Sequence, residues 1–132
     1  MKYGYKKETS LEFSDAVKKV REELKKEGFG VLTEINVKET LKEKLDVDYD
    51  DYIILGVCNP PFAYKALQIE KDIGLLLPCN VIVYSDKEKG KTIVSAINPM
   101  EAMSIVGNPE QDELKEIANS IGEKLKSIVD LI

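Results

Sequence analysis

The sequence has no histidine and no tryptophan, only two cysteines, and a single arginine among its 19 cationic residues. Without histidine, Ser-His-Asp and Cys-His nucleophile pairs, imidazole metal ligands and an ordinary histidine pH switch are excluded. Two thiols fall short of a tetrahedral metal site, and they lack the Cys-x-x-Cys spacing of a redox motif. The side chains that remain for chemistry are carboxylates, lysines, tyrosines, hydroxyls and the two thiols.

The sequence also lacks an excess of basic charge and any long hydrophobic run. Its 132 residues include 19 Lys and Arg against 24 Asp and Glu, which gives a net charge of −5. This balance argues against nucleic-acid binding and against docking on anionic membranes. No apolar run approaches the ~20 residues that span a bilayer, and the N-terminus lacks the apolar segment of a signal peptide. We therefore expect a cytoplasmic protein with neither nucleic acid nor membrane as a partner.

The chain is expected to form a single domain over residues 1–132, because no repeat, linker or low-complexity tract divides it. Hydrophobic periodicity and capping residues predict the secondary structure. Strands are expected over residues 2–7, 29–35, 52–58, 79–84 and 91–97, and helices over 14–28, 36–45, 59–69 and about 110–131, with a short helical or irregular segment at 100–106. The order β-α-β-α-β-α-β-β-α predicts a two-layer α+β fold, with helices packed on one face of a largely antiparallel sheet.

Several segments resemble one known family, the domain of unknown function 302. They are Gly28-Phe29-Gly30-Val31-Leu32-Thr33-Glu34-Ile35, Leu55-Gly56-Val57-Cys58-Asn59-Pro60, Ile73-Gly74-Leu75-Leu76-Leu77-Pro78-Cys79, Thr40-Leu41-Lys42-Glu43-Lys44 and Asn98-Pro99-Met100. The resemblance covers essentially the whole chain. It implies a compact α+β domain, often a homodimer, of no established biochemical activity.

The chain departs from this family's pattern at three positions. The family more often has Asp at the positions of Asn36 and Asn98, and it often has His at the position of Tyr64. Asparagine accepts hydrogen bonds but takes up no proton at neutral pH. Any acid-base role that these groups carry in relatives is therefore in doubt here.

The two cysteines are the first candidates for chemistry. Cys58 ends one expected strand and Cys79 begins the next. A helix of about 11 residues between them advances ~17 Å, and an extended segment over residues 74–78 can return a similar distance, which brings the thiols together. They would form a redox pair or thiolate site, with the adjacent helix N-terminus lowering the pKa of Cys58. The alternative is that both are buried and act as small hydrophobic groups.

Glu34 and two asparagines complete the candidate site. Glu34 lies between apolar residues in an expected strand, so a buried carboxylate there would be a general base or a ligand anchor. The alternative is that it faces solvent or pairs with a lysine such as Lys38 or Lys44. Asn59 and Asn98 each precede a proline at a strand end. They would line a pocket together with Tyr64 and the thiols, or simply form turns.

No cofactor and no metal ion are expected. Residues 46–51 form an acidic loop that begins like a calcium-binding loop, with Asp46, Asp48 and Asp50 at alternating positions. However, Asp51 and Val57 occupy the positions where a calcium loop requires glycine and glutamate. The glycines form neither a P-loop nor a dinucleotide fingerprint.

Three hypotheses about function follow. In the first, the protein binds a small ligand or a partner in a cleft lined by Glu34, Cys58, Asn59, Tyr64, Cys79 and Asn98. In the second, it is a thiol-dependent enzyme or redox protein that uses Cys58 and Cys79, with Glu34 as the acid-base group. In the third, it is a structural module that dimerises through its sheet or its last helix. The sequence does not decide whether the protein is an enzyme, and a homodimer is expected.

Overall fold

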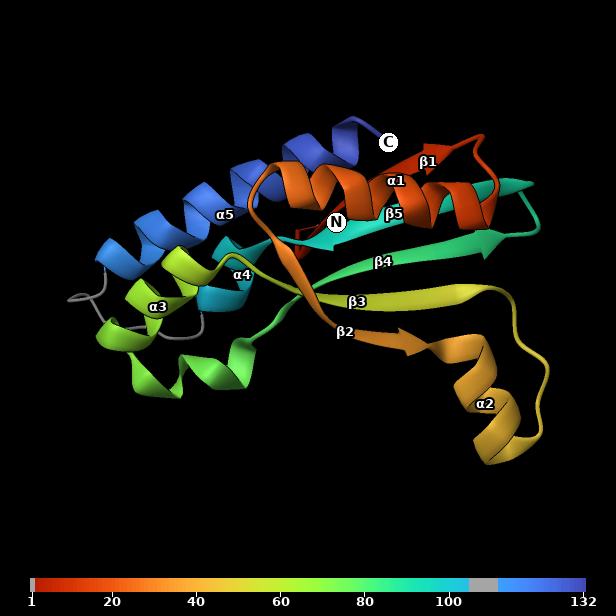
Figure 1. Cartoon of the computed structure of the whole chain (residues 1–132), viewed down its shortest axis with the longest axis horizontal. Helices are drawn as coiled ribbons and strands as arrows, with labels where there is room; N and C mark the ends of the chain where they lie inside the picture. Colours follow the sequence, from red (N-terminus) through yellow and green to blue (C-terminus); the bar gives the residue numbers. More distant parts are fainter. Residues whose placement is uncertain (1, 105–111) are drawn as a thin grey trace.

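The computed structural model describes residues 2–104 and 112–132. In chain order, its elements are β1 (Gly4–Thr9), α1 (Phe13–Lys26), β2 (Gly30–Asn36), α2 (Val37–Leu45), β3 (Tyr52–Cys58), α3 (Pro60–Ile69), the 3-10 helix η1 (Lys71–Leu76), β4 (Cys79–Asp86), β5 (Lys91–Ile97), α4 (Pro99–Met103) and α5 (Asp112–Asp130). The strands form one antiparallel sheet in the order β1-β5-β4-β3-β2 (Figure 1). The predicted α+β fold is confirmed. The expected start of the last helix near residue 110, and the end of the segment at 100–106, lie outside the described residues.

Helices α1 and α5 cover one face of the sheet (Figure 1). Successive register partners across β3, β4 and β5 form buried apolar rows on this face, because side chains directly opposite one another share a side of the sheet. One row is Leu55, Val81 and Ala96, and the next is Ile53, Val83 and Val94. The helices add their own buried stripes: Ala16, Val20 and Leu24 from α1, and Ile121, Leu125, Ile128 and Val129 from α5. These are the stripes that the 3.6-residue periodicity predicts.

Local signals explain where two of the helices begin or end. Gly28 has φ +83° after α1, and its N–H bonds to the carbonyl of Lys25 while the N–H of Phe29 bonds to that of Leu24. This pair of bonds is the Schellman motif, as expected for a glycine at this position. Asn36 caps α2 by accepting a hydrogen bond from the N–H of Glu39 at 3.1 Å. Helix α1 begins at Phe13, one residue before the start of the expected helix at residue 14, and Glu12 occupies its N-cap position.

The connection between β3 and β4 differs from the expected extended path. Residues Lys71–Leu76 form η1, which buries Ile73 and is capped by the side chain of Glu70. The chain nevertheless returns to the same end of the sheet, because β3 and β4 are antiparallel neighbours with Val57 opposite Cys79.

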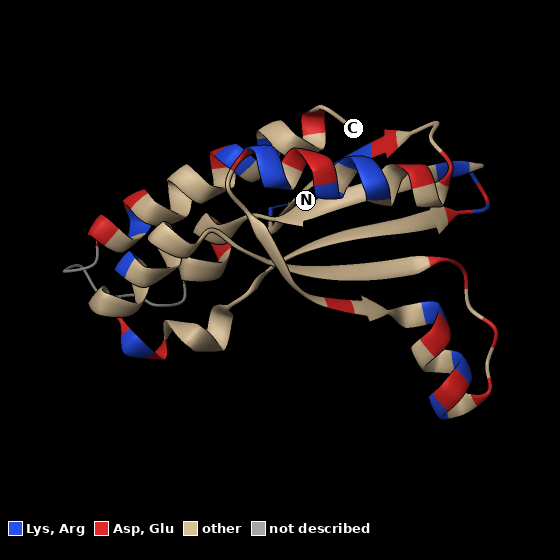
Figure 2. Cartoon of the chain, in the orientation of Figure 1, with Lys and Arg blue, Asp and Glu red and all other residues tan. Residues whose placement is uncertain are grey.

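Charge is distributed unevenly over the molecule. Lysines and acidic residues lie on the outer surfaces of α1, α2 and α5 and in the loops, whereas β3, β4 and β5 are almost free of them (Figure 2). Helix α2 has no buried residue and projects from the edge of the sheet (Figure 1). Within residues 2–104 and 112–132, no helix is both long and apolar enough to cross a bilayer.

Candidate functional site

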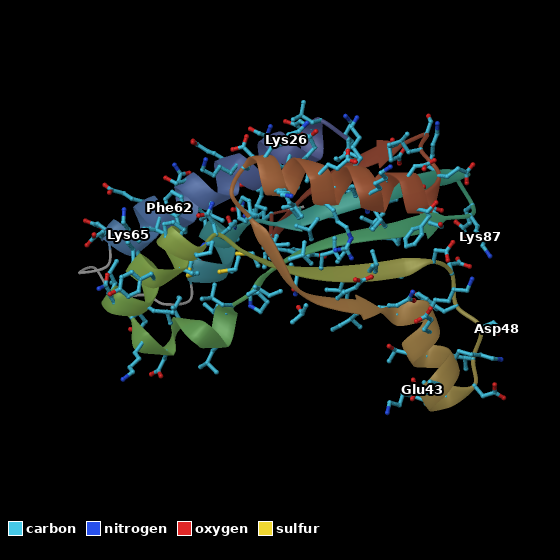
Figure 3. All side chains as sticks on the ribbon, in the orientation of Figure 1. Lys26, Glu43, Asp48, Phe62, Lys65 and Lys87 are labelled. Atoms are coloured by element: carbon cyan, nitrogen blue, oxygen red, sulfur yellow. The ribbon has the colours of Figure 1, made fainter. Side chains whose placement is uncertain are left out.

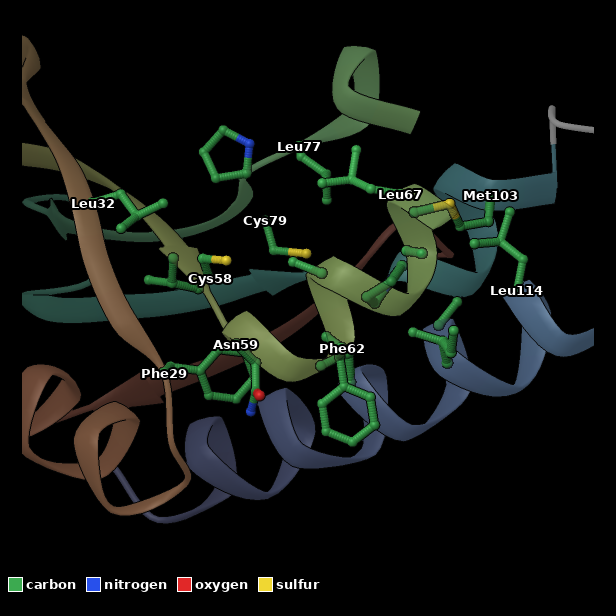
Figure 4. A pocket seen from close by; sticks show the side chains of 18 residues that line it. Phe29, Leu32, Cys58, Asn59, Phe62, Leu67, Leu77, Cys79, Met103 and Leu114 are labelled. Atoms are coloured by element: carbon green, nitrogen blue, oxygen red, sulfur yellow. The ribbon is translucent and has the colours of Figure 1, made fainter. Parts of the chain in front are cut away.

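A pocket of about 320 Å³ opens between the sheet and helices α3, α4 and α5 (Figure 4). It lies where two hydrophobic clusters meet: the main core, which includes Phe29, Val57 and Ile121, and a smaller cluster around Ala66 and Leu114. The described residues that line it are Phe29, Leu32, Val57, Cys58, Asn59, Phe62, Ala63, Ala66, Leu67, Leu77, Pro78, Cys79, Pro99, Met103, Leu114, Ile117, Ala118 and Ile121. None of them is charged.

The pocket brings the two thiols together. Cys58 is the last residue of β3 and Cys79 is the first residue of β4, and both are half-buried and free. Figure 4 shows them at one end of the pocket, with Met103 and Leu114 at the other. The antiparallel pairing of β3 with β4 is the reason for this proximity.

Both thiols are held in the protonated form at neutral pH. Burial raises the pKa of Cys79 to about 11, and the nearby Cys58 adds to this shift. Burial also raises the pKa of Cys58. The expected lowering by the helix N-terminus is therefore wrong. The first turn of α3 begins with Pro60 and Pro61, which have no N–H to donate to a thiolate.

Asn59 lines the pocket and is buried, with 8% of its surface exposed. It occupies the N-cap position of α3, but its side chain makes no capping bond. Its Nδ2 instead donates a hydrogen bond to the carbonyl oxygen of Glu27 at 3.2 Å. The residue thus ties the start of α3 to the end of α1 and fixes one wall of the pocket.

Glu34 does not line the pocket. It lies opposite Leu55 on the side of the sheet that faces α1, but at the edge strand, where 51% of its side chain is exposed. There it forms an ion pair with Arg21 of α1 at 2.5 Å. This geometry fits the alternative in which the Glu34 carboxylate is exposed or paired with a cation. The partner, however, is Arg21, and the expected lysines Lys38 and Lys44 do not pair with Glu34.

Tyr64 and Asn98 do not line the pocket either, although Asn98 directly precedes Pro99, which does. Tyr64 is 66% exposed, because Phe62, Ala63 and Ala66 occupy the inner face of α3. Asn98 caps α4: its Oδ1 accepts from the N–H of Met100, and its Nδ2 donates to the carbonyl of Lys2. The expectation of one cleft with all six residues is therefore corrected: Cys58, Asn59 and Cys79 are brought together, and the other three are not.

The sequence interpretation missed the wall that α4 and α5 contribute. Met103, Leu114, Ile117, Ala118 and Ile121 line the pocket, and in the sequence the last four show only the spacing of an apolar helical stripe. Nothing in that spacing distinguishes a cavity wall from a filled core. Among the described residues, no group of three or more Cys, Asp or Glu side chains is arranged to hold a metal ion.

Comparison with known proteins identifies the family. The family described as "Domain of unknown function DUF302" matches residues 5–132 of this chain. The chain belongs to this family. Among solved structures, the chain is similar to the crystal structure of an uncharacterized conserved protein DUF302 from Bacillus stearothermophilus, with 33% identity over 98% of both chains and a TM-score of 0.88. No protein with a curated function matches the chain. The DUF302 resemblance seen in the sequence is confirmed.

Proposed function

We propose that this DUF302 protein binds a small, uncharged and largely apolar molecule in the pocket between the sheet and α3, α4 and α5. The observation that supports this proposal is the chemistry of the described lining, which combines apolar side chains with two protonated thiols and one carboxamide. A charged ligand would lose its hydration there without gaining a partner, which is costly. The volume of about 320 Å³ lies at the small end of the range for ligand sites.

The polar groups of the pocket would orient such a ligand. Cys58 and Cys79 offer weak S–H donors, and Asn59 offers a carboxamide that is already held in place through its bond to Glu27. A ligand with one hydroxyl or carbonyl group at the end of an apolar body matches this distribution. The thiol-dependent alternative has less support, because the thiolate is the reactive form and both pKa values are raised.

A titration with matched probes tests the proposal. Benzyl alcohol, benzylamine and benzoate share one apolar body and differ in charge. We expect benzyl alcohol to shift the amide NMR resonances of the pocket residues in the ¹⁵N-labelled protein, and to bind at least ten times more tightly than either ion. Equal binding of the three probes, or shifts confined to residues outside the pocket, would contradict the proposal.

A pair of variants locates the binding. Ala63→Leu adds volume inside the pocket and is expected to weaken benzyl alcohol binding at least five-fold. Ala102→Leu adds the same volume to the half-buried residue of α4 that does not line the pocket, so it serves as the control. Native-like spectra of both variants would show that each has folded. A loss of binding in Ala102→Leu with binding retained in Ala63→Leu would place the ligand elsewhere.

We also propose that the protein forms a homodimer through β2 and α2. Leu32, Ile35 and Leu45 are 65%, 47% and 66% exposed, and they belong to two consecutive elements, although Leu32 also lines the pocket. Helix α2 carries both lysines and glutamates (Figure 2), so opposite charges can meet where this helix faces its own copy. Light scattering after gel filtration is expected to give a dimer mass for the native chain and a monomer mass for Ile35→Lys. A monomer for the native chain would refute this proposal.

A further inference from the structure

A second cavity lies on the opposite face of the sheet from α1 and α5. It has a volume of about 560 Å³ and is lined by Tyr3, Lys6, Tyr49, Asp50, Asp51, Tyr52, Ile82, Tyr84, Ser85, Asp86, Lys87, Glu88 and Ser95. We call it the tyrosine groove. Figure 3 shows Lys87 at one end of the molecule, and Phe62, which lines the apolar pocket, at the other. The two cavities share no residue, so the groove is independent of the function proposed above.

Aromatic rings form the floor of the groove. Tyr52 and Tyr84 are register partners on β3 and β4, and their rings stack at 5.2 Å with an interplanar angle of 9°. The ring of Tyr49 lies 6.4 Å from that of Tyr52 at an angle of 51°. Tyr49 and Tyr3 are 47% and 70% exposed. Four of the six tyrosines of the chain thus line one cavity.

The groove already contains a contact between a cation and a ring. The ammonium group of Lys6 lies over the ring of Tyr84, 5.9 Å from its centroid. The face of a tyrosine ring carries partial negative charge and attracts cations at this distance. The phenol of Tyr52 stays neutral well above neutral pH, because burial and the neighbouring tyrosines raise its pKa.

The charged residues around these rings favour a cation over an anion. Four carboxylates line the groove against two ammonium groups: Asp50, Asp51, Asp86 and Glu88 against Lys6 and Lys87. Lys87 pairs with Asp50 at 3.0 Å, and Lys38, which is not part of the lining, pairs with Asp51 at 3.5 Å. With Lys38 included, the carboxylates exceed the ammonium groups by one. A phosphate or carboxylate ligand would meet this negative excess, whereas an organic cation would be attracted both by it and by the ring faces.

We propose that the tyrosine groove binds a small organic cation with a methylated ammonium group. Methyl groups weaken the hydration of an ammonium ion and give it apolar surface, so it can contact several rings at once and leave the carboxylates at its periphery. Aromatic residues grouped around a cavity are the general means by which proteins bind such ions. Lys6 is the chain's own competitor for the ring of Tyr84.

Choline and its neutral carbon isostere, 3,3-dimethylbutan-1-ol, provide the test. They have nearly the same shape, so a difference in affinity reports on the charge. We expect isothermal titration to show that choline binds at least about five-fold more tightly than the alcohol. Equal affinities, or no choline binding, would overturn the proposal.

Variants assign the binding to the groove. Tyr52→Leu and Tyr84→Leu are each expected to lower choline affinity at least five-fold, while Tyr64→Leu, at an exposed tyrosine on α3, leaves it unchanged. Lys6→Met removes the competing ammonium group and is expected to raise choline affinity, a gain that a misfolded variant would not show. No gain in Lys6→Met would refute the proposal. A change of self-association in the tyrosine variants without a change in choline affinity would refute it as well, and would identify the groove as an interface between copies of the chain.

Discussion

Gly56 in the centre of β3 is a position where a single methyl group is expected to destabilise the fold. Its backbone does not have a positive φ, so alanine is compatible with the local conformation. The limit is space. A Cβ atom at this position would overlap Oγ1 of Thr33 on β2 and would lie 2.8 Å from Cγ of Pro78. Gly56 is buried, and Thr33 is its register partner.

The size of the effect follows from how far these two neighbours can move. The side chain of Thr33 can rotate its hydroxyl away, since its own Cβ would be 3.5 Å from the new methyl group, which is an ordinary contact. The ring of Pro78 is joined to the backbone twice and moves only with the chain. Overpacking of this kind typically costs ~1–3 kcal/mol, and the lower entropy of the unfolded alanine variant offsets roughly 0.4–1 kcal/mol of it. We expect Gly56→Ala to lower the free energy of unfolding by about 1–2 kcal/mol.

Guanidinium denaturation followed by circular dichroism measures this difference, and Gly74→Ala is the matched control. A Cβ at Gly74 meets no atom within 4 Å, and its φ is not positive, so that substitution should cost no stability and should raise the free energy of unfolding by up to about 1 kcal/mol. The variant Thr33→Ala removes one of the two obstacles at Gly56. The loss caused by Gly56→Ala should therefore be smaller in a Thr33→Ala background, with the part due to Pro78 remaining. Equal stabilities of Gly56→Ala and Gly74→Ala would show that this reasoning about space is wrong.

Three further predictions concern Cys79 and Glu34, two of the candidate site residues. Iodoacetamide is expected to alkylate Cys79 at pH 7 at least about ten times more slowly than free cysteine, because the pKa of Cys79 is raised to about 11. Mass spectrometry of the native protein measures this rate. Fast modification would show that the Cys79 thiol is not held in the protonated form. The unfolded chain should lose the Cys79 proton near pH 9.0 and the folded chain only near 11, so the free energy of unfolding should fall as pH rises through this window, with a smaller fall in Cys79→Ala. Glu34→Gln breaks an exposed ion pair and should cost less than about 1 kcal/mol without altering benzyl alcohol binding; a loss of binding would return Glu34 to the site.

Features that depend on neighbouring residues in the chain could be predicted from the sequence. Gly28 and Phe29 end α1 as expected, because a left-handed glycine and its hydrogen bonds involve residues within one helical turn. Asn36 caps α2 for the same reason. The order of elements likewise follows from periodicity, which reflects burial on one side of each helix or strand.

The environment of Glu34 could not be predicted in this way. Its apolar neighbours indicated burial, but β2 proved to be the edge strand, and α1 places Arg21 beside the carboxylate. Strand order and helix placement arise from contacts between residues far apart in sequence. Tyr64 is a different case: Phe62 and Ala66, two residues to either side of it on α3, face inward, so the helical periodicity already indicated that Tyr64 is exposed.

The chain has no histidine, and the described lining of the pocket has no charged residue that could take up or release a proton at neutral pH. Cys58 and Cys79 meet because β3 and β4 are antiparallel, and no described residue nearby carries a charge that would ionise them. Pro60 and Pro61 remove two of the four backbone N–H groups that a helix N-terminus would otherwise offer a thiolate. Burial raises the pKa of both thiols, and no nearby positive charge lowers it, so both thiols stay protonated. A pocket whose described lining has no imidazole and no charged group is poorly suited to acid-base or thiolate chemistry, and the same properties make it well suited to a neutral ligand. The tyrosine groove has the opposite character, with an excess of carboxylates around exposed rings. The two probes, benzyl alcohol and choline, should therefore bind at opposite ends of the molecule without competing with each other.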